Sequence, residues 1–270
     1  MTSSSTPRSP EPPPRAERSP TKSLRLGALR IDDLTFEQAL DAIEALVAAG
    51  QGGSVFTPNV DHVVLVDEDP RLRAAYDDVS LSLVDGTPVL WASRLLGHPL
   101  PEKISGSDLT MPLLARAAKH GLRVYLLGGG EGVAGLAAAR AKEQLPGLQI
   151  VGTDAPFIDL ERDDPKHAAI VARIAAAKPD LVLVALGCPK QEIFIHRVSA
   201  AIRPAVALGI GAGLDFIAGT IPRAPRWISA AGLEWLYRLG REPKRLWRRY
   251  LVRDPKFLVI LLRDLRNRRR

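Results

Sequence analysis

The chain has 270 residues, of which 46% are hydrophobic and 25% charged, a composition that suits a globular protein with its own core. A single cysteine, Cys188, excludes an internal disulfide, and no apolar run approaches the roughly 20 residues needed to cross a bilayer. The formal net charge of +7 is concentrated at the C-terminus, where residues 241–270 hold twelve Lys/Arg against three Asp/Glu. Such a tail is typical of proteins that bind phosphate groups of a lipid surface, a nucleic acid or a nucleotide.

The N-terminal segment has many prolines and almost no apolar side chains. It cannot bury enough surface to offset the entropy lost on ordering, so we expect residues 1–23 to form a disordered arm. The segment also lacks the apolar stretch of a secretory signal. We therefore expect a cytoplasmic protein, either free or attached to the inner face of the plasma membrane.

From Leu24 onwards, apolar runs of strand length alternate with helical patterns. A helix is predicted over 35–49, and Thr35 is suited to begin it. Strands are predicted at 54–57, 81–84, 124–127, 149–151, 181–185 and 206–208, and further helices at 60–66, 109–119, 133–144 and 167–177. This alternation predicts an α/β fold over residues 24–220, with a Rossmann-like, mainly parallel sheet and helices on both faces.

After Gly219 the pattern becomes helical and basic. Helices are predicted over 230–239, 243–252 and 255–265, and the last two begin with proline, as a first helical turn allows. We expect residues 221–270 to form a basic appendage. Its last helix has an apolar stripe flanked by arginines, a pattern that favours a membrane surface over a plain core position; the stripe consists of Phe257, Leu258, Leu261, Leu262 and Leu265.

Ligands of parallel sheets bind at the carboxyl ends of the strands. Asp85 follows a predicted buried strand and precedes a glycine, so it can accept a proton from a substrate hydroxyl, or simply begin a turn. Asn59 and Gln191 also follow strands. Their amides can orient a sugar hydroxyl or cap the next helix.

Segment 130–135 matches the GxGxxG pattern of dinucleotide-binding proteins, between a predicted strand and a predicted helix. Asp154 follows at about the distance where that fingerprint has its ribose-binding acid. An NAD-dependent oxidoreductase is therefore the alternative function. The pattern alone is weak evidence, because a glycine-rich turn before a helix can serve any phosphate.

No residue pattern indicates a metal site. Asp67, Glu68 and Asp69 spell a DxD sequence, the metal-binding signature of many nucleotide-sugar transferases, but they follow a predicted helix and precede Pro70. We expect them to separate two helices. The histidines and Cys188 show no ligand spacing, so each histidine is expected to be a surface or half-buried polar residue.

The strongest physical signal is a series of arginines spaced by three or four residues, namely Arg238, Arg241, Arg245 and Arg248. A continuous helix would line them along one side, where they can hold a diphosphate and neutralise a UDP leaving group. A solvated basic face is the plain alternative. A nucleic-acid-binding protein would also explain the basic tail, but it would leave the strand-end amides and glycines without a role.

Seven segments resemble motifs of the WecG/TagA/CpsF glycosyltransferases, in the family's order over residues 26–265. They are TPNVDHVV, VDGTPVLW, EKISGSDL, VYLLGGGEGVA, PDLVLVALGCPKQEIFI, GIGAGLDFIAGTIPRAPRW and GLEWLYRLGREPKRLWRRYL. The resemblance implies an inverting, metal-independent enzyme without a cofactor. It implies transfer of N-acetylmannosamine, its uronic acid or a related hexose from UDP to an undecaprenyl-diphosphate-linked sugar, for wall teichoic acid, common antigen or exopolysaccharide.

The resemblance also implies roles for single residues. Asp85 matches the general base, Asn59 the active-site amide beside Thr57, and Gln191 the glutamine of the PKQE motif. The arginines that close over the diphosphate match Arg238, Arg245 and Arg248, and the phosphate loop of the nucleotide sugar matches Gly128, Gly129 and Gly130.

Lys103 is a departure, because family members often carry arginine there and lysine loses the two-pronged geometry. The implied partners are the UDP-sugar, the lipid-diphosphate-linked acceptor and the membrane surface, which the basic C-terminal helices would contact. Nucleic acid is not among them. Self-association into a homo-oligomer stays open.

Overall fold

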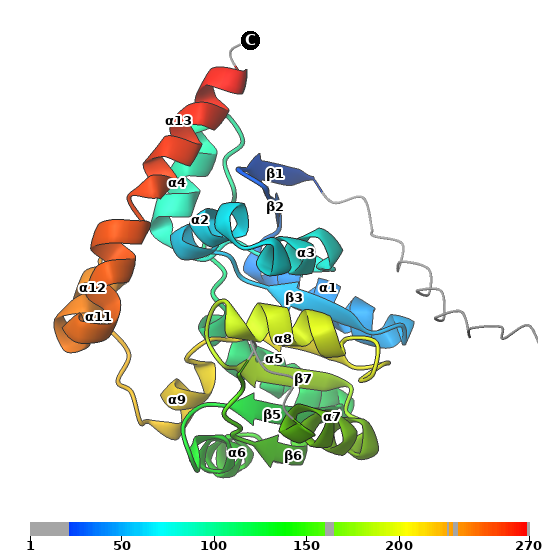
Figure 1. The fold of residues 1–270 in the computed structure, drawn as a ribbon. Helices are drawn as coiled ribbons and strands as arrows, with labels where there is room; N and C mark the ends of the chain where they lie inside the picture. The colour runs from blue at the N-terminus through cyan, green and yellow to red at the C-terminus, as the bar shows by residue number, and fades with distance from the viewer. Residues whose placement is uncertain (1–21, 160–164, 226, 229–231, 269–270) are drawn as a thin grey trace, which may run out of the picture.

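The computed structural model describes residues 22–268 except 160–164, 226 and 229–231. The described chain forms an α/β fold around a six-stranded sheet, with a small antiparallel hairpin and a group of C-terminal helices beside it (Figure 1). The predicted arm, residues 1–23, lies almost entirely outside the described residues. Its last residue, Ser23, already begins the first strand.

The sheet is parallel throughout, with the strand order β4-β3-β8-β7-β5-β6. All six strands were predicted, and the largest difference is at the end of β6, which extends to Asp154 along β5. The strands are β3 (Gly53–Phe56), β4 (Leu81–Ser82), β5 (Arg123–Gly128), β6 (Gln149–Asp154), β7 (Leu181–Ala185) and β8 (Val206–Gly209). Since they all run in one direction, their carboxyl ends share one edge of the sheet.

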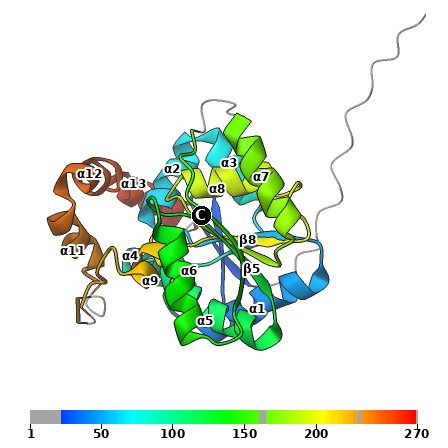
Figure 2. The same ribbon diagram turned by 90° about the horizontal axis from the view of Figure 1, so that it is seen from below.

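Helices cover both faces of the sheet, which confirms the predicted fold class (Figure 2). Tyr125 and Leu127 of β5 pack against one layer and Val124 and Leu126 against the other, as the alternation of a strand requires. The first layer contains α2 (Val60–Glu68), α3 (Pro70–Asp78), α7 (Pro165–Ala177) and α8 (Lys190–Val198), and the second contains α1 (Phe36–Ala49), α5 (Gly106–His120), α6 (Val133–Gln144) and α9 (Gly213–Ala218).

Several short elements were not predicted. The hairpin consists of β1 (Ser23–Leu26) and β2 (Leu29–Asp32). Two unpredicted helices, α8 and α4 (Thr87–Leu95), have nine residues each and begin beside a proline, as does α3, which was expected after residues 67–69 but given no bounds. Nine residues are too few for the helical period to stand out from the sequence.

The C-terminal helices are α11 (Glu234–Arg241), α12 (Pro243–Arg248), η1 (Arg249–Arg253) and α13 (Lys256–Arg268). The apolar stripe expected on α13 is divided. Phe257 and Leu261 are buried in the core beside β1 and α2, whereas Leu258 and Leu262 are exposed. The helix α13 is therefore both a core helix and a surface helix, because one face packs against the core and a second apolar face is exposed. No helix in the described part of the chain is long and apolar enough to cross a membrane.

Candidate active site

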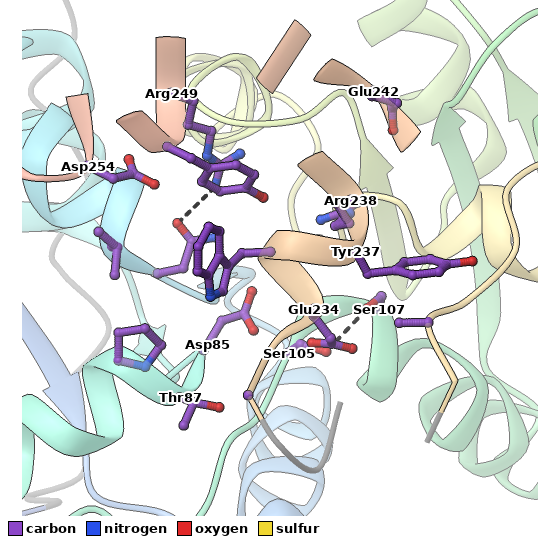
Figure 3. Close-up of a pocket in the computed structure, with 18 of the residues that line it drawn as sticks. Asp85, Thr87, Ser105, Ser107, Glu234, Tyr237, Arg238, Glu242, Arg249 and Asp254 are labelled. Carbon is purple, nitrogen blue, oxygen red and sulfur yellow. Dashed lines mark hydrogen bonds between the residues drawn. The ribbon is translucent and has the colours of Figure 1, made fainter. Parts of the chain in front are cut away.

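A cavity of about 720 Å³ lies between the carboxyl edge of the sheet and the C-terminal helices (Figure 3). This volume lies within the range of small-molecule sites. The side chains that line it from the α/β fold include Asn59, Asp85, Thr87, Ser105 and Ser107, and those from the C-terminal helices include Glu234, Tyr237, Arg238, Arg241, Glu242, Arg249 and Asp254.

Asp85 lies at this cavity, just after β4. Its backbone N–H donates to the carbonyl of Pro58 at 2.9 Å, and the next residue, Gly86, has a φ of +94° that turns the chain into α4. Burial raises the pKa of Asp85 to about 6, although the charge of Lys103 opposes the increase. Such a carboxylate is ionised at neutral pH and more basic than an exposed aspartate, which suits a general base.

Lys103 lies behind the cavity lining. Its Nζ is 3.1 Å from Oε2 of Glu234 and 3.6 Å from Oδ2 of Asp108. Burial alone would lower the pKa of Lys103, but the carboxylates of Glu234, Asp85 and Asp108 raise it above its usual value. A charged lysine here joins α11 to the sheet and lies near the base. Lysine cannot bind in the two-pronged way of arginine, but its charge still links the two sides of the cavity through Glu234.

Asn59 is both a helix cap and a cavity residue, so the two roles that the sequence left open coexist. Its Oδ1 accepts a hydrogen bond from the N–H of Asp61 at 3.1 Å, which caps α2. The same oxygen accepts from Nη2 of Arg249 at 3.2 Å. Arg249 comes from η1 and was missed by the sequence analysis.

Thr57 and Gln191 are buried next to the site and are not among the residues that line the cavity. Oγ1 of Thr57 accepts from the N–H of Gly106 at 3.2 Å, and Oε1 of Gln191 accepts from the N–H of Gly211 at 3.1 Å. A Cβ on Gly106 would lie 2.6 Å from the carbonyl oxygen of Gly209, so α5 can begin here only with glycine. The two side chains thus brace the loops that surround the cavity.

The glycine loop after β5 also lies outside the cavity lining. Gly128 packs against the carbonyl of Ala185, where a Cβ would collide, and the N–H of Gly129 donates to the same carbonyl at 2.9 Å; Gly130 is exposed. Asp154, the acid of the dinucleotide fingerprint, accepts a hydrogen bond from Tyr125 and pairs with Arg173 at 2.8 Å. Its carboxylate is therefore already engaged, which weakens the NAD alternative.

The arginines do not form the single row that a continuous helix predicts. The chain bends at Glu242, where φ is −130° and ψ is 55°, so that α11 and α12 point in different directions. As a result Arg238 and Arg241 line the cavity and Arg248 does not; its guanidinium lies 5.4 Å from the ring centre of Trp247. The side chain of Arg245 lies outside the described residues.

Among the described residues, no ion pair engages Arg238. Arg238 also lies close enough to Tyr250 to lower the pKa of that phenol, against the larger effect of burial. A guanidinium that lines a cavity without a carboxylate partner is suited to bind an anionic ligand.

His62 differs from its prediction as a surface or half-buried residue, since its exposed fraction is 4%. Its Nδ1 lies 3.3 Å from the backbone N of Asn59 and 2.9 Å from Oδ1 of the same residue, and its Nε2 lies 3.2 Å from Oε1 of Glu192. The ligand atoms of His62, Cys188 and Glu192 all lie within 4.8 Å of one another. Sequence spacing could not show this group, because the packing of α2 near α8 brings it together.

In the described contacts, His62 and Glu192 are joined by a hydrogen bond, and the half-buried Cys188 lies beside them. Burial raises the pKa of the Cys188 thiol, and a metal would need the thiolate. Oε1 of Glu192 is also bonded by Nε2 of Gln191 at 2.7 Å. Of the DxD sequence, Asp67 and Glu68 end α2, and Asp69 alone separates α2 from α3, where it caps α3.

The model of the glycosyl transferase WecG/TagA/CpsF family matches residues 24–270 of the chain. The chain is also 35% identical over 216 residues to the N-acetylglucosaminyldiphosphoundecaprenol N-acetyl-beta-D-mannosaminyltransferase of Bacillus spizizenii, covering 80% of this chain and 81% of that protein. The protein of the same name from Bacillus subtilis is 32% identical over 220 residues, 80% of each chain. The family match spans both the α/β fold and the C-terminal helices.

Proposed function

Because the chain belongs to the WecG/TagA/CpsF family of glycosyltransferases, we propose that it transfers an N-acetylhexosamine of the N-acetylmannosamine type from UDP to an undecaprenyl-diphosphate-linked sugar. The names of the two Bacillus relatives describe mannosaminyl transfer to N-acetylglucosaminyldiphosphoundecaprenol and support this choice. Polysaccharide synthesis for the cell surface is the corresponding pathway.

The observation that carries the proposal is a basic carboxylate, Asp85, in the same cavity as the guanidinium of Arg238, which has no ion pair with any described residue. Asp85 takes the proton of the acceptor hydroxyl while the oxygen of that hydroxyl bonds to the anomeric carbon of the donor sugar. The bond from that carbon to the UDP oxygen breaks, so the configuration inverts. UDP leaves against Arg238 and Arg241, whose charge replaces that of a metal.

Most of the remaining predicted contacts lie outside the cavity lining and act indirectly in this proposal. Thr57 and Gln191 hold the loops around the nucleotide sugar, and the glycines 128–130 shape the turn after β5. Arg248 on α12 adds positive charge near the diphosphate without lining the cavity, and Arg245 keeps the role that the family resemblance implies. Asn59 donates its amide hydrogens to the bound sugar or phosphate.

We also propose that the enzyme acts as a peripheral protein on the inner face of the plasma membrane. Leu258 lines the cavity and is exposed, and the apolar face continues from it along α13. Arg268 of α13 donates to the carbonyl of Leu96 at 2.6 Å, so α13 ends beside the end of α4. An apolar face with arginines at its border suits an anionic bilayer. Other exposed apolar side chains of α4, η1 and α13 are Trp91, Leu95, Leu251, Val252, Val259 and Leu262.

The proposal is tested by incubating the full chain with a panel of UDP-sugars and a short-chain N-acetylglucosaminyl-diphosphate lipid, with mass spectrometry as readout. We expect the mass of one N-acetylhexosamine to be added, with inverted anomeric configuration by NMR and no effect of a chelator. Absence of transfer from every donor would contradict the function. Loss of transfer in the chelator would contradict metal independence alone.

A further inference from the structure

A buried carboxylate joins the C-terminal helices to the edge of the sheet that carries the site. Asp61 of α2 has an exposed fraction of 1%, and both of its described ion-pair partners come from η1. Nε of Arg249 lies 3.1 Å from its Oδ2, and Arg253 pairs with its Oδ1. A carboxylate withdrawn from water is strongly destabilising unless it is paired, so Asp61 favours the docked position of η1.

The docking of η1 depends on such polar contacts more than on apolar packing. Neither α11 nor η1 has a buried residue, and Arg249 itself is partly exposed. Segments with few buried apolar contacts open at a low cost in free energy. The described ion pairs of Asp61 are therefore a main contribution that holds η1 against α2.

Arg249 makes a second contact, with a group of the active site. While its Nε faces Asp61, its Nη2 donates to Oδ1 of Asn59 at 3.2 Å. The N–H of Asp61 donates to the same oxygen at 3.1 Å. Nδ1 of His62 also lies 2.9 Å from this oxygen. Because the backbone N–H and the guanidinium both donate to Oδ1, the NH2 group of Asn59 points to the other side of the amide, where it can donate to a ligand in the cavity.

We propose that Arg249 is a positioning residue, through which the docking of η1 sets the orientation of the Asn59 amide. The inference rests on the proposed transferase function. When η1 lies on α2, Arg249 bridges Asp61 and Asn59, and the amide presents its hydrogens to the substrate. When η1 leaves, Asn59 still caps α2 and stays beside Nδ1 of His62, but its Oδ1 loses its charged donor and the amide is held less firmly. The donor group is thus best ordered when the C-terminal helices close the cavity.

A double-mutant cycle between Arg249 and Asn59 separates positioning from direct substrate binding. Asn59→Ser keeps a capping oxygen for α2 but removes the amide. We expect Arg249→Gln to lower kcat about tenfold, the effect of losing a charge-assisted hydrogen bond, with a smaller change in KM for the UDP-sugar. In the Asn59→Ser background the same substitution should add almost nothing. If the losses in kcat of the two single variants multiplied in the double variant, the proposal would be overturned, because Arg249 would then act on the substrate itself.

Lys244→Gln is the charge-matched control, since Lys244 is an exposed residue of α12 that has no described contact with Asp61 or Asn59. With the short-chain acceptor we expect its kcat to match the wild type. A tenfold loss in this control would show that total charge matters more than the position of Arg249, and would overturn the proposal.

Amide hydrogen exchange measures the docking without any turnover. Asp61→Asn removes the charge that holds both arginines, so we expect faster exchange over 249–253 and unchanged exchange in β7, which also reports that the variant is folded. Arg249→Gln leaves Arg253 in place and should have a smaller effect. Unchanged exchange over 249–253 in Asp61→Asn would overturn the docking role. If the wild type transfers no sugar, the proposed function fails, and the exchange experiment still tests the contact.

Discussion

The two sides of the cavity are built by different means. On the sheet side, Asp85 follows buried strands, is held by a backbone hydrogen bond, and has fully buried side chains such as Phe56 and Leu83 beneath it. On the other side, α11 and η1 bury no residue, and their described links to the sheet include ion pairs such as Lys103 with Glu234. The base is therefore fixed before the substrate arrives, whereas the cationic side depends on contacts that salt and water weaken.

The last helix, α13, is held by apolar packing, as the sheet side of the cavity is. It is held by buried Phe257, Ile260 and Leu261, and Gly27 of the hairpin packs closely against Ile260. Between α9 and α13, the described helices α11 and η1 bury no residue, so we expect their contacts to open at a lower cost in free energy than those of α13.

The largest effect is expected on the sheet side, from Asp85→Asn. Loss of a general base should lower kcat by about 10²–10⁴-fold, with UDP affinity nearly unchanged in calorimetry. The fold raises the pKa of Asp85 above its usual value, so stability is lost as the pH rises through about 6 and the carboxylate ionises. The variant should therefore melt at the same or a higher temperature at neutral pH. Near wild-type turnover would remove Asp85 from the mechanism.

The anchoring of α13 is tested by Ile260→Ala. Removing a buried isoleucine side chain should lower the free energy of unfolding by about 2–5 kcal/mol in urea titrations, while kcat at low temperature stays close to that of the wild type. Val259→Ala is the matched control, because its side chain is 69% exposed on the same helix; we expect a change within about 0.5 kcal/mol. Equal costs for both variants would mean that α13 does not pack as described.

On the cationic side, Arg238→Gln should weaken the leaving-group contact. A charge-assisted hydrogen bond contributes about 1.5–3 kcal/mol, which corresponds to a loss of about 10- to 100-fold in kcat/KM. Arg238→Lys keeps the charge and should recover part of the loss. If Arg238→Gln instead left both kcat and KM unchanged, the diphosphate would have to be bound elsewhere.

The smallest expected effect is the change of kcat/KM with pH. Asp85 must be ionised to accept a proton, so kcat/KM should fall about tenfold per unit below a pH of about 6 and stay level above it. Burial and the charge of Asp61 also raise the pKa of Asp254 to about 6, although Arg249 and Arg253 oppose the increase. Asp254→Asn removes the second group with a pKa of about 6, so a fall in kcat/KM below pH 6 that persists in this variant belongs to Asp85. A profile that is flat through pH 6 in the wild type would contradict the assignment of Asp85.

Much of the sheet side could be predicted from local patterns. Alternating apolar runs indicated the six strands, and parallel strands place their carboxyl ends on one edge, which is why Asp85 and Asn59 do line one cavity. The predicted start of the first helix at Thr35 is confirmed, and the structure adds a capping box between Thr35 and Gln38, three residues apart.

The sequence by itself determined the α/β class, the family and the position of the candidate base, because each depends on residues close together in the chain. Only the tertiary structure decided which arginines reach the cavity and how the C-terminal helices are held. Arg249 contacts a side chain 190 residues away, and the bend at Glu242 turns Arg248 out of the predicted row. Such contacts depend on how separate helices pack, and the spacing of residues along one helix carries no information about that packing.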